Sequence, residues 1–379
     1  MTDWLKQLLE DVQVQKNTKA SWLNGSAPIL IYGTGTMAQD IEHVLTERGL
    51  PVYGFIDHLP RQTSSLNGIP IFKPEAIPTR QTTENSPIVV LGIHNNQANI
   101  EQIIEQLNSY GITQIISTVE LYDYFSAELG IRYWLTSRAY YPPWKPVLEE
   151  TLALFSDEGS KSLFRSILEF RLLGDASRLP TPDLTNQYHP ADIPAWKTPL
   201  RFIDCGAFDG DTLADFIQND IEIEAVAAFE PDLLNFKKLA DFVDTHRQKI
   251  ASAQVWPCGV FSSTRQLKFE TGQGMASNIA SAGAAIIQAV ALDDALPTFT
   301  PNLIKMDIEG AEYDALLGAR KLIRTHLPGL AISLYHRPEH LWQLPLLVER
   351  IAPGKYKFMM RSHAQNSFDL VLYAIPFAG

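Results

Sequence analysis

Short apolar runs alternate with amphipathic segments along most of the chain. Such runs predict buried β-strands, whereas apolar residues at every third or fourth position predict helices. In the carboxyl-terminal half the pattern predicts strands at 201–204, 225–229, 254–260, 303–308, 330–334, 356–360 and 370–374. A hairpin is also expected near 267–290, with residues 272–278 overhanging the site. Strands that alternate with helices predict a parallel sheet covered by helices, an α/β fold.

The amino-terminal half repeats the same alternation. Strands are expected at 29–32, 52–56, 69–72, 88–93 and 112–117, and helices at 38–48 and 97–109. Residues 1–26 carry apolar side chains at helical spacing and predict one amphipathic helix, used for packing or for contact with another copy of the chain. The sequence therefore predicts two doubly wound, Rossmann-like sheets.

Four segments follow from this pattern. They are an amino-terminal helix (1–27), a Rossmann-like domain (28–118), a connector rich in aromatic residues and proline (119–198) and a second α/β domain (199–379). Within the connector, a helix at about 147–173 is interrupted near 157–160, where Asp157 or Ser160 could cap its second half. We expect a helical subdomain that covers the second sheet; in the alternative, Tyr188 and His189 belong to a lid over a substrate.

Composition and net charge limit the classes of function that the chain can have. The chain has 379 residues, enough for two domains, and a net charge of -12 from 31 basic and 43 acidic residues. Lys and Arg form no cluster, so we expect no nucleic-acid partner. No apolar stretch has the length of a membrane span and the amino terminus does not resemble a signal peptide, so we expect a cytoplasmic protein. Cys205 and Cys258 are expected to be free thiols.

A glycine turn follows the first strand of the second domain. The strand ends at Asp204, the turn runs from Gly206 to Gly210, and an acid, Glu230, ends the next strand 24 residues after the first glycine. Glycines let the backbone approach a ligand, and the acid can accept hydrogen bonds from both ribose hydroxyls. The alternative is a plain turn capped by Asp211 or Thr212.

NAD and S-adenosylmethionine sites share this layout, but two details favour S-adenosylmethionine. The turn lacks the G-x-G-x-x-G pattern of a pyrophosphate site, and Asp204, Asp209 and Asp211 would repel phosphates. A sulfonium cation with an ammonium group tolerates these acids.

A second group of charged residues lies on the strand at 303–308. Alternate side chains of a strand share a face, so Lys305, Asp307 and Glu309 are expected to point the same way. Buried charges are costly unless they are paired. One interpretation is a structural ion pair between Lys305 and Asp307. In the other, Asp307 orients the methionine ammonium group, and Glu309 or Lys305 faces the acceptor.

A histidine follows the fifth strand, where a general base would reach the substrate. We expect His336, rather than His340 in the following helix, to fill this role, since an unperturbed imidazole titrates near neutral pH. The expected catalytic residues are Glu309, His336 and Lys305.

Four ordered motifs resemble the FkbM family of class I methyltransferases. They lie at 202–212, 228–232, 292–294 and 304–312, within a match over about 199–375. The resemblance implies a seven-stranded sheet with an antiparallel last strand, S-adenosylmethionine as cofactor, and O-methylation of a sugar or another hydroxyl in polysaccharide, glycolipid or secondary-metabolite synthesis. The expected cofactor residues are Asp204, Gly206, Gly210, Asp211, Thr212, Glu230 and Asp307.

The amino-terminal domain carries a weaker glycine motif. G-x-G-x-x-A runs from Gly33 through Gly35 to Ala38, and Asp57 lies 24 residues after Gly33, where a ribose-reading acid would stand. The domain resembles the nucleotide-sugar-binding domain found ahead of bacterial sugar acetyltransferases. Either it binds a nucleotide or nucleotide-sugar through Gly33, Gly35 and Asp57, or it is kept for architecture or dimerisation.

Two other functions stay open: a non-catalytic scaffold that binds nucleotide-sugar, and an NAD-dependent oxidoreductase that uses the amino-terminal domain. A metal ion is also conceivable, because Asp307, Glu309 and His336 offer two carboxylates and an imidazole. Metal-dependent methyltransferases of the catechol type, however, have an Asp-Asn pair where this chain has Tyr335 and His336. We therefore expect no metal, and a small-molecule or saccharide acceptor as partner.

Overall fold

The structure is a computed structural model that describes residues 2–58, 64–77, 86–269 and 285–377. The chain divides into two compact units. The amino-terminal unit comprises residues 1–149, 162–182 and 364–368, and the carboxyl-terminal unit comprises 150–161, 183–363 and 369–379. The tip of 272–278, predicted to overhang the site, lies outside the described residues.

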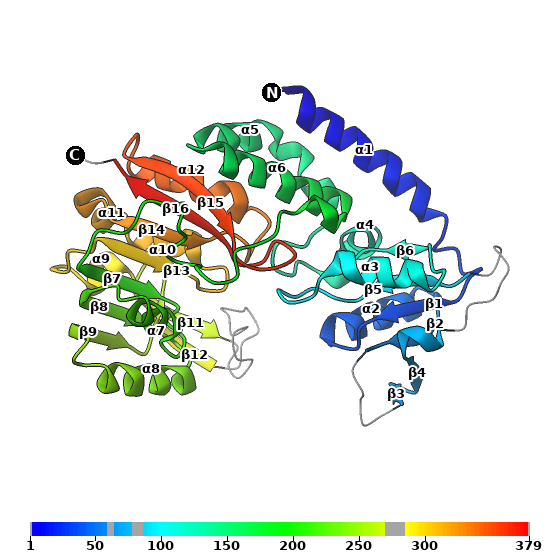
Figure 1. The fold of residues 1–379 in the computed structure, drawn as a ribbon, viewed down its shortest axis with the longest axis horizontal. Helices are drawn as coiled ribbons and strands as arrows, with labels where there is room; N and C mark the ends of the chain where they lie inside the picture. Colours follow the sequence, from blue (N-terminus) through cyan, green and yellow to red (C-terminus); the bar gives the residue numbers. More distant parts are fainter. Residues whose placement is uncertain (1, 59–63, 78–85, 270–284, 378–379) are drawn as a thin grey trace. The chain divides into compact units, whose positions relative to one another are not determined.

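A six-stranded sheet forms the centre of the amino-terminal unit (Figure 1), in the order β3-β4-β2-β1-β5-β6. Its strands are β1 (Ile29–Tyr32), β2 (Val52–Ile56), β3 (Ser65–Leu66), β4 (Ile69–Phe72), β5 (Ile88–Leu91) and β6 (Ile115–Ile116). All neighbours pair in parallel except β3 with β4. The predicted parallel sheet is confirmed, with β6 shorter than expected.

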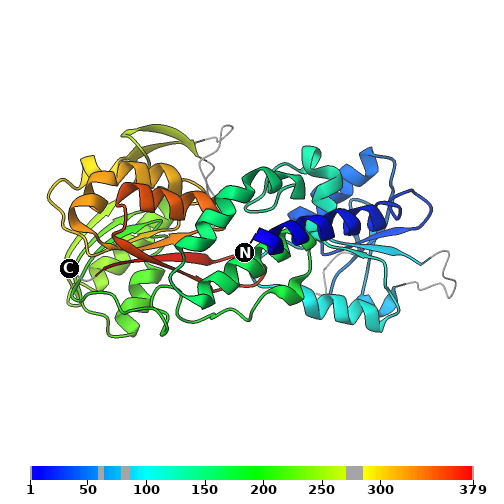
Figure 2. The same cartoon turned by 90° about the horizontal axis from the view of Figure 1, so that it is seen from above.

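Helices cover both faces of this sheet. Two of them, α2 (Thr36–Glu47) and α4 (Thr118–Leu129), lie on one face, and α3 (Ile100–Ser109) lies on the other (Figure 2). The amino-terminal helix α1 spans Thr2–Ala20. The predicted interrupted helix is present as α5 (Lys145–Leu154) and α6 (Glu158–Leu173), and Asp157 accepts a hydrogen bond from the amide of Ser160 (2.8 Å). Short 3-10 turns occur at Pro74–Ala76, Arg138–Tyr140, Pro142–Trp144 and Ala176–Arg178.

The carboxyl-terminal unit contains the seven-stranded sheet that the sequence predicted, in the order β15-β16-β14-β13-β7-β8-β9. Only β16 runs antiparallel to its neighbours. The strands are β7 (Leu200–Cys205), β8 (Ile223–Phe229), β9 (Ile250–Trp256), β13 (Leu303–Met306), β14 (Gly329–Ser333), β15 (Tyr356–Ser362) and β16 (Leu370–Pro376). Since β7 and β13 are central neighbours, the turns that follow them lie together at the carboxyl edge.

Helices flank both faces of this sheet as well (Figures 1 and 2). One face carries α7 (Asp211–Gln218) and α8 (Leu233–Thr245). The other carries α9 (Leu292–Ala295), α10 (Glu312–Gly318), α11 (Arg320–His326) and α12 (His340–Ile351). The predicted hairpin is present as β11 (Arg265–Phe269) and β12 (Ala285–Val290), which form a small sheet with β10 (Gly259–Val260).

Two expectations differ from the structure. The third strand begins at Ile250 and ends at Trp256, about four residues earlier than predicted, because Pro257 has no amide hydrogen for the sheet and ends the strand. The expected connector at 119–198 is divided between the two units: residues 119–149 and 162–182 group with the amino-terminal unit, whereas residues 150–161 and 183–198 group with the carboxyl-terminal unit.

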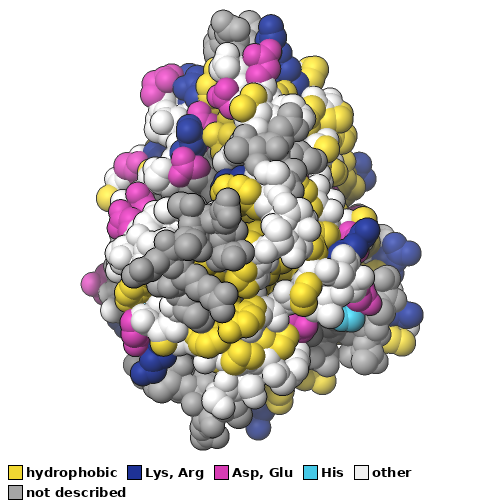
Figure 3. Space-filling model, turned by 90° about the vertical axis from the view of Figure 1, so that its right-hand side faces the viewer, with side chains coloured by type: hydrophobic (Ala, Val, Ile, Leu, Met, Phe, Trp, Pro, Cys, Tyr) yellow, Lys and Arg dark blue, Asp and Glu magenta, His cyan; other side chains and the backbone are white. Residues whose placement is uncertain are grey.

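None of the helices in the described parts of the chain combines the length and apolar character that a bilayer crossing requires. On the face shown in Figure 3, Lys and Arg side chains are scattered among acidic and hydrophobic ones, without a continuous basic field among the residues described there. This agrees with the charge pattern of the sequence.

A buried ion pair in the amino-terminal unit gives a test of its packing. Asp123 and Arg138 are paired with side chains only 1% and 2% exposed, and Asp123 also accepts the amide hydrogen of Arg138 (3.0 Å). Asp123→Ala should lower the free energy of unfolding by about 3–5 kcal/mol, since it leaves a buried guanidinium without its partner. Urea unfolding followed by circular dichroism measures this change.

The matched control is Asp40→Ala, because Asp40 is 43% exposed and pairs with Arg132 near the surface. Removal of an exposed pair should cost at most about 1 kcal/mol. Equal losses for the two variants would contradict the assignment of the Asp123 pair as a buried one.

Candidate active site

The glycine turn after β7 lies directly against the turn after β13. Gly206 has a φ of 81°, and a Cβ at this position would stand 1.9 Å from the carbonyl oxygen of Asp307. The amides of Gly206 and Ala207 both donate to the carbonyl of Phe229 at the end of β8 (3.0 Å each). Glycine is required here because the backbones of two neighbouring strand ends approach each other too closely for a side chain.

Glu230 lies at the end of β8 and is 7% exposed. Its Oε2 accepts the amide hydrogen of Phe208 (3.0 Å) and its Oε1 accepts that of Asp232 (2.8 Å). Burial raises the pKa of this carboxyl to about 7, although the two amides oppose the shift. The carboxylate is thus held at the rim of the glycine turn, and each oxygen keeps a second lone pair for a ligand.

Asp204 and Lys305 form a buried ion pair with Nζ and Oδ1 3.0 Å apart. The two residues are partners in the register of β7 and β13, so their side chains lie side by side on one face. Lys305 also donates to the carbonyl of Gly206 (2.6 Å). Asp204 is fully buried. The predicted partner of Lys305, Asp307, is therefore replaced by Asp204, and the pair braces the glycine turn.

The turn after β13 presents the next acids. The strand ends at Met306, so the expected alternation of side chains does not extend to Glu309. Glu309 has a φ of 53° and Gly310 a φ of 100°, two successive left-handed residues. Positive φ at a non-glycine residue is a local strain that is common in functional sites. Asp307 accepts hydrogen bonds from the hydroxyls of Tyr188 (3.2 Å) and Tyr335 (3.4 Å).

His336 follows β14 and is surrounded by carboxylates. Its Nδ1 is 2.7 Å from Oε1 of Glu312, a fully buried residue at the start of α10. Its Nε2 faces Oδ1 of Asp307 at 3.3 Å and Oε2 of Glu309 at 3.6 Å. His340 in α12 lies 3.3 Å from the other oxygen of Glu312. Glu312 thus anchors both histidines.

The charges of this group are strongly coupled. Burial alone would lower the pKa of His336, but Glu312 and Glu309 raise it to about 10. Burial raises the pKa of Glu309 to about 8, whereas Glu312 is kept ionised, with a pKa of about 2, because the attraction of His336 outweighs its burial. The pKa of His336 thus lies well above that of a free imidazole, and its predicted role as a general base stays a prediction.

The remaining predicted cofactor residues surround the start of α7. Gly210 has a φ of 95° and precedes the helix, and Asp211 accepts the amide hydrogen of Thr212 (2.8 Å). Asp211 is exposed, whereas Thr212 is buried. The structure thus brings the turn, Glu230 and the β13 acids to one edge of the sheet. It does not test which of these residues contact a cofactor.

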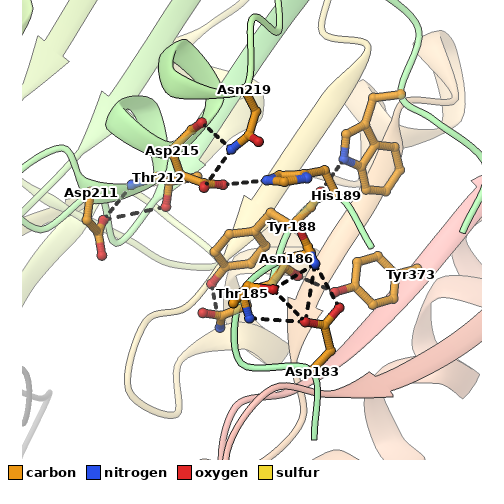
Figure 4. A network of polar contacts seen from close by, with 12 residues as sticks. Asp183, Thr185, Asn186, Tyr188, His189, Asp211, Thr212, Asp215, Asn219 and Tyr373 are labelled. Atoms are coloured by element: carbon orange, nitrogen blue, oxygen red, sulfur yellow. Dashed lines mark hydrogen bonds and ion pairs between the residues drawn. The ribbon is translucent and has the colours of Figure 1, made fainter. Parts of the chain in front are cut away.

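Residues 183–189 run over the carboxyl edge of the sheet in the same unit. Figure 4 shows Asp183 bonded to Thr185 and Asn186, and His189 paired with Asp215 of α7 (2.8 Å). Tyr188 between them is buried, and its ring lies 5.4 Å from Nζ of Lys305. Residues 183–189, which the alternative prediction made part of a lid, thus bring the hydroxyl of Tyr188 into hydrogen-bond contact with Asp307.

The amino-terminal unit has a separate cavity of about 640 Å³. Gly33 after β1, Asp57 after β2 and the polar face of α3 line it. The neighbouring Thr34 hydroxyl donates to Asp57, and Gly35 lies outside the lining. The cavity lies at the carboxyl edge of the sheet beside the β1/β5 switch point, where ligands of such folds bind. The nucleotide site at Gly33, Gly35 and Asp57 stays a prediction.

Glu312 and Tyr188 make more contacts with the predicted site residues than the sequence suggested. Glu312 lies in the first turn of α10, where the helix dipole alone favours a carboxylate. Beyond this, it accepts the amide hydrogen of Ile308 (2.9 Å) and binds His336. Its position six residues after the end of β13, on the same edge as a histidine, was the available signal.

Residues 204–365 match the family model of the methyltransferase FkbM domain. Over these residues, somewhat less than half of the chain, the protein is similar to FkbM methyltransferase domains. The crystal structure of Methyltransferase FkbM from Methylobacillus flagellatus KT is similar over 97% of this chain and 99% of that chain, with 21% identity and a TM-score of 0.78. This likeness shows that the fold is shared over nearly the whole chain. No curated protein matches the sequence.

Two other solved structures resemble it more weakly. A putative rRNA-methylase from Clostridium thermocellum covers 46% of this chain and 84% of its own, with 11% identity and a TM-score of 0.31. A methyltransferase of Podospora anserina bound to S-adenosylhomocysteine covers 76% of this chain and all of its own, with 9% identity and a TM-score of 0.29. At these scores neither adds to the assignment.

The close approach at Gly206 can be tested. Gly206→Ala should lower the free energy of unfolding by more than the about 1–2 kcal/mol that left-handed backbone alone costs, because the new Cβ meets the Asp307 carbonyl. It should also displace the turn and weaken ligand binding. Denaturant unfolding and calorimetric titration measure the two effects.

Gly354→Ala is the control, since Gly354 also has a positive φ (65°) but no atom within 4 Å of a Cβ. It should show the backbone cost and leave ligand binding unchanged. If the free energy of unfolding falls by the same amount in both variants, the contact with the Asp307 carbonyl does not constrain residue 206.

Proposed function

We propose that the chain is an S-adenosylmethionine-dependent methyltransferase that methylates a hydroxyl group. The observation that carries this proposal is the juxtaposition of the Gly206–Gly210 turn, the Glu230 carboxylate and the acids after β13 at one edge of the sheet. Glu230 would accept hydrogen bonds from the ribose hydroxyls. The glycines of the turn would let the cofactor lie close to the backbone. Asp307 would face the ammonium and sulfonium end.

The charge of this edge supports a cationic donor. Two lysines lie against the turn, and each is paired with an acid: Lys305 with Asp204 and Lys238 with Asp209 of the turn itself. The exposed oxygens belong to Asp211, Asp307 and Glu309. Carboxylates attract the positively charged methyl donor and repel a pyrophosphate, so the site favours S-adenosylmethionine over NAD.

Methyl transfer breaks the bond between sulfur and the methyl carbon and forms a bond between that carbon and the acceptor oxygen. The hydroxyl proton must leave in the same step or before it, and the acceptor must lie in line with the sulfur. Glu309 is suited to take this proton, because its side chain is 21% exposed and its pKa is raised to about 8 by burial. Lys305 and His336 would act as fixed cations that position these acids.

We infer that the acceptor is a sugar or another small polyhydroxylated molecule, as the family resemblance implies. Two alternatives remain: a non-catalytic scaffold that binds nucleotide-sugar, and, with less support, an NAD-dependent oxidoreductase that uses the cavity beside Gly33. Release of S-adenosylhomocysteine from S-adenosylmethionine across a panel of sugar and polyol acceptors tests the proposal. Cofactor binding without release on any acceptor would favour the scaffold, and binding of NADH alone would favour the oxidoreductase.

The role of Glu230 predicts a pH dependence. Its pKa is raised to about 7, so the carboxylate gains a proton as the pH falls from 8 to 6 and becomes a poorer acceptor for the ribose hydroxyls. The dissociation constant for S-adenosylmethionine should rise as the pH falls through this range. Calorimetric titration at several pH values measures the effect.

Glu230→Ala should weaken cofactor binding by about 1–3 kcal/mol through lost hydrogen bonds and should remove this part of the pH dependence. Glu224→Ala, at an exposed acid near the opposite end of β8, serves as the control and should bind as the parent does. An affinity for S-adenosylmethionine that Glu230→Ala leaves unchanged would refute the ribose assignment.

A further inference from the structure

The cavity of about 640 Å³ in the amino-terminal unit is not used by the proposed methyl transfer. Its described lining residues lie between positions 32 and 109, within residues 1–149 of that unit. Its volume falls within the about 300–1,000 Å³ of small-molecule sites. We propose that this cavity binds a neutral ring with several hydroxyl groups, either a saccharide or the ribose of a nucleoside, through Tyr32, Asp57 and the polar face of α3.

The hydroxyl of Tyr32 is independent evidence for a ligand. Tyr32 is the last residue of β1, lines the cavity and is 3% exposed. Among the described residues, its buried hydroxyl has no hydrogen-bond partner. Burial and the charge of Asp57 raise the pKa of Tyr32 to about 12, so the phenol keeps its proton and remains a donor. A buried donor without an acceptor destabilises a fold, and an oxygen of a ligand would supply that acceptor.

Asp57 brings a carboxylate to the same cavity, directly after β2. Its amide donates to the carbonyl of Phe72 in β4 (3.0 Å), and its Oδ2 accepts the hydroxyl hydrogen of Thr34. These two contacts fix the backbone and the side chain. A carboxylate has about four lone-pair sites, so Asp57 can accept hydrogen bonds from ligand hydroxyls while it keeps its bond to Thr34.

One face of α3 adds polar side chains to the lining. Gln102, Glu105, Gln106 and Ser109 all line the cavity, and their spacing of three and four residues places them on a single face of the helix. Leu107 lies on the opposite face and belongs to the core. Side-chain amides and hydroxyls can both donate and accept hydrogen bonds, as the hydroxyls of a sugar do. The lining is therefore complementary to a polyhydroxylated ligand.

The same lining disfavours a nucleotide diphosphate. Asp57 and Glu105 are carboxylates, which repel phosphate, and Lys and Arg do not occur among the lining residues in the described part of the chain. In doubly wound folds a pyrophosphate lies at the amino terminus of the first helix after the glycine turn. Here that helix is α2, and its N-cap residue, Gly35, lies outside the lining. The cavity thus suits the sugar part of a nucleotide-sugar better than its phosphates.

This inference does not rest on the proposed methyl transfer. The residues that line the cavity and those of the Gly206–Gly210 edge belong to different units of the chain. Binding of a neutral sugar and binding of S-adenosylmethionine can therefore be measured separately. If only S-adenosylmethionine binds, the cavity proposal fails and the proposed donor stands; if only the sugar binds, the reverse holds.

The experiment measures binding to the full chain by saturation-transfer NMR. The neutral probes are methyl glycosides, short uncharged oligosaccharides and uridine, and UDP-glucose is the charged comparison. We expect millimolar or tighter binding of at least one neutral probe, and weaker binding of UDP-glucose than of that probe. Tighter binding of a saccharide than of uridine identifies a saccharide as the source of the ring, and the opposite order identifies a nucleoside.

Tyr32→Phe is the most specific variant, because it removes only the hydroxyl. Its affinity for the bound probe should fall about three- to tenfold through one lost hydrogen bond. Its stability in urea should not fall, since the hydroxyl gives up no partner in the described fold. Asp57→Asn should weaken binding at least about tenfold, because hydrogen bonds to a charged acceptor are the stronger ones.

Glu101→Gln is the matched control, because it removes one negative charge from the first turn of α3 at a residue outside the lining. It should bind the probe as the parent chain does. Circular dichroism verifies that each variant is folded. The proposal is overturned if the parent chain binds no neutral probe at millimolar concentration, if UDP-glucose binds more tightly than every neutral probe, or if Tyr32→Phe and Asp57→Asn bind as tightly as Glu101→Gln does.

Discussion

The contact between Gly206 and the carbonyl of Asp307 is the constraint on which the rest of the site depends. Two parallel strands, β7 and β13, end side by side, and a side chain at residue 206 would force their turns apart. The buried pair of Asp204 and Lys305 braces the same place, since Lys305 also binds the carbonyl of Gly206. The glycine turn after β7 and the turn after β13 that carries the acids are thus held together.

The sequence predicted most of the fold, because hydrophobic periodicity and glycine turns are local signals. The strands β1, β2 and β4 begin and end where expected, and the seven-stranded sheet has its predicted reversed last strand. The third strand was misplaced because an apolar stretch continues past Pro257 into β10, which belongs to another sheet. Periodicity shows that a segment is buried but not which sheet buries it.

The site was predicted less well, because it depends on pairings across strands. Lys305 was assigned to its near neighbour in sequence, Asp307, or to a substrate, whereas the register of two strands gives it to Asp204. The importance of Glu312 depends on a contact with His336, 24 residues away. Residue types at strand ends indicated which side chains would gather, but only the folded chain shows how their charges are matched.

The position of His336 changes how methyl transfer can be understood. A histidine at the end of the fifth strand is expected to act as a base, yet the surrounding carboxylates raise its pKa to about 10 and favour its protonated form. A buried cation among acids is stable only while those acids remain charged beside it. A proton on the imidazole satisfies this condition, because it lets His336 pair with Asp307 and Glu309 on one side while Glu312 keeps its short hydrogen bond on the other. The group is then better understood as a fixed set of ligands for positive charge than as a catalytic base with acidic neighbours.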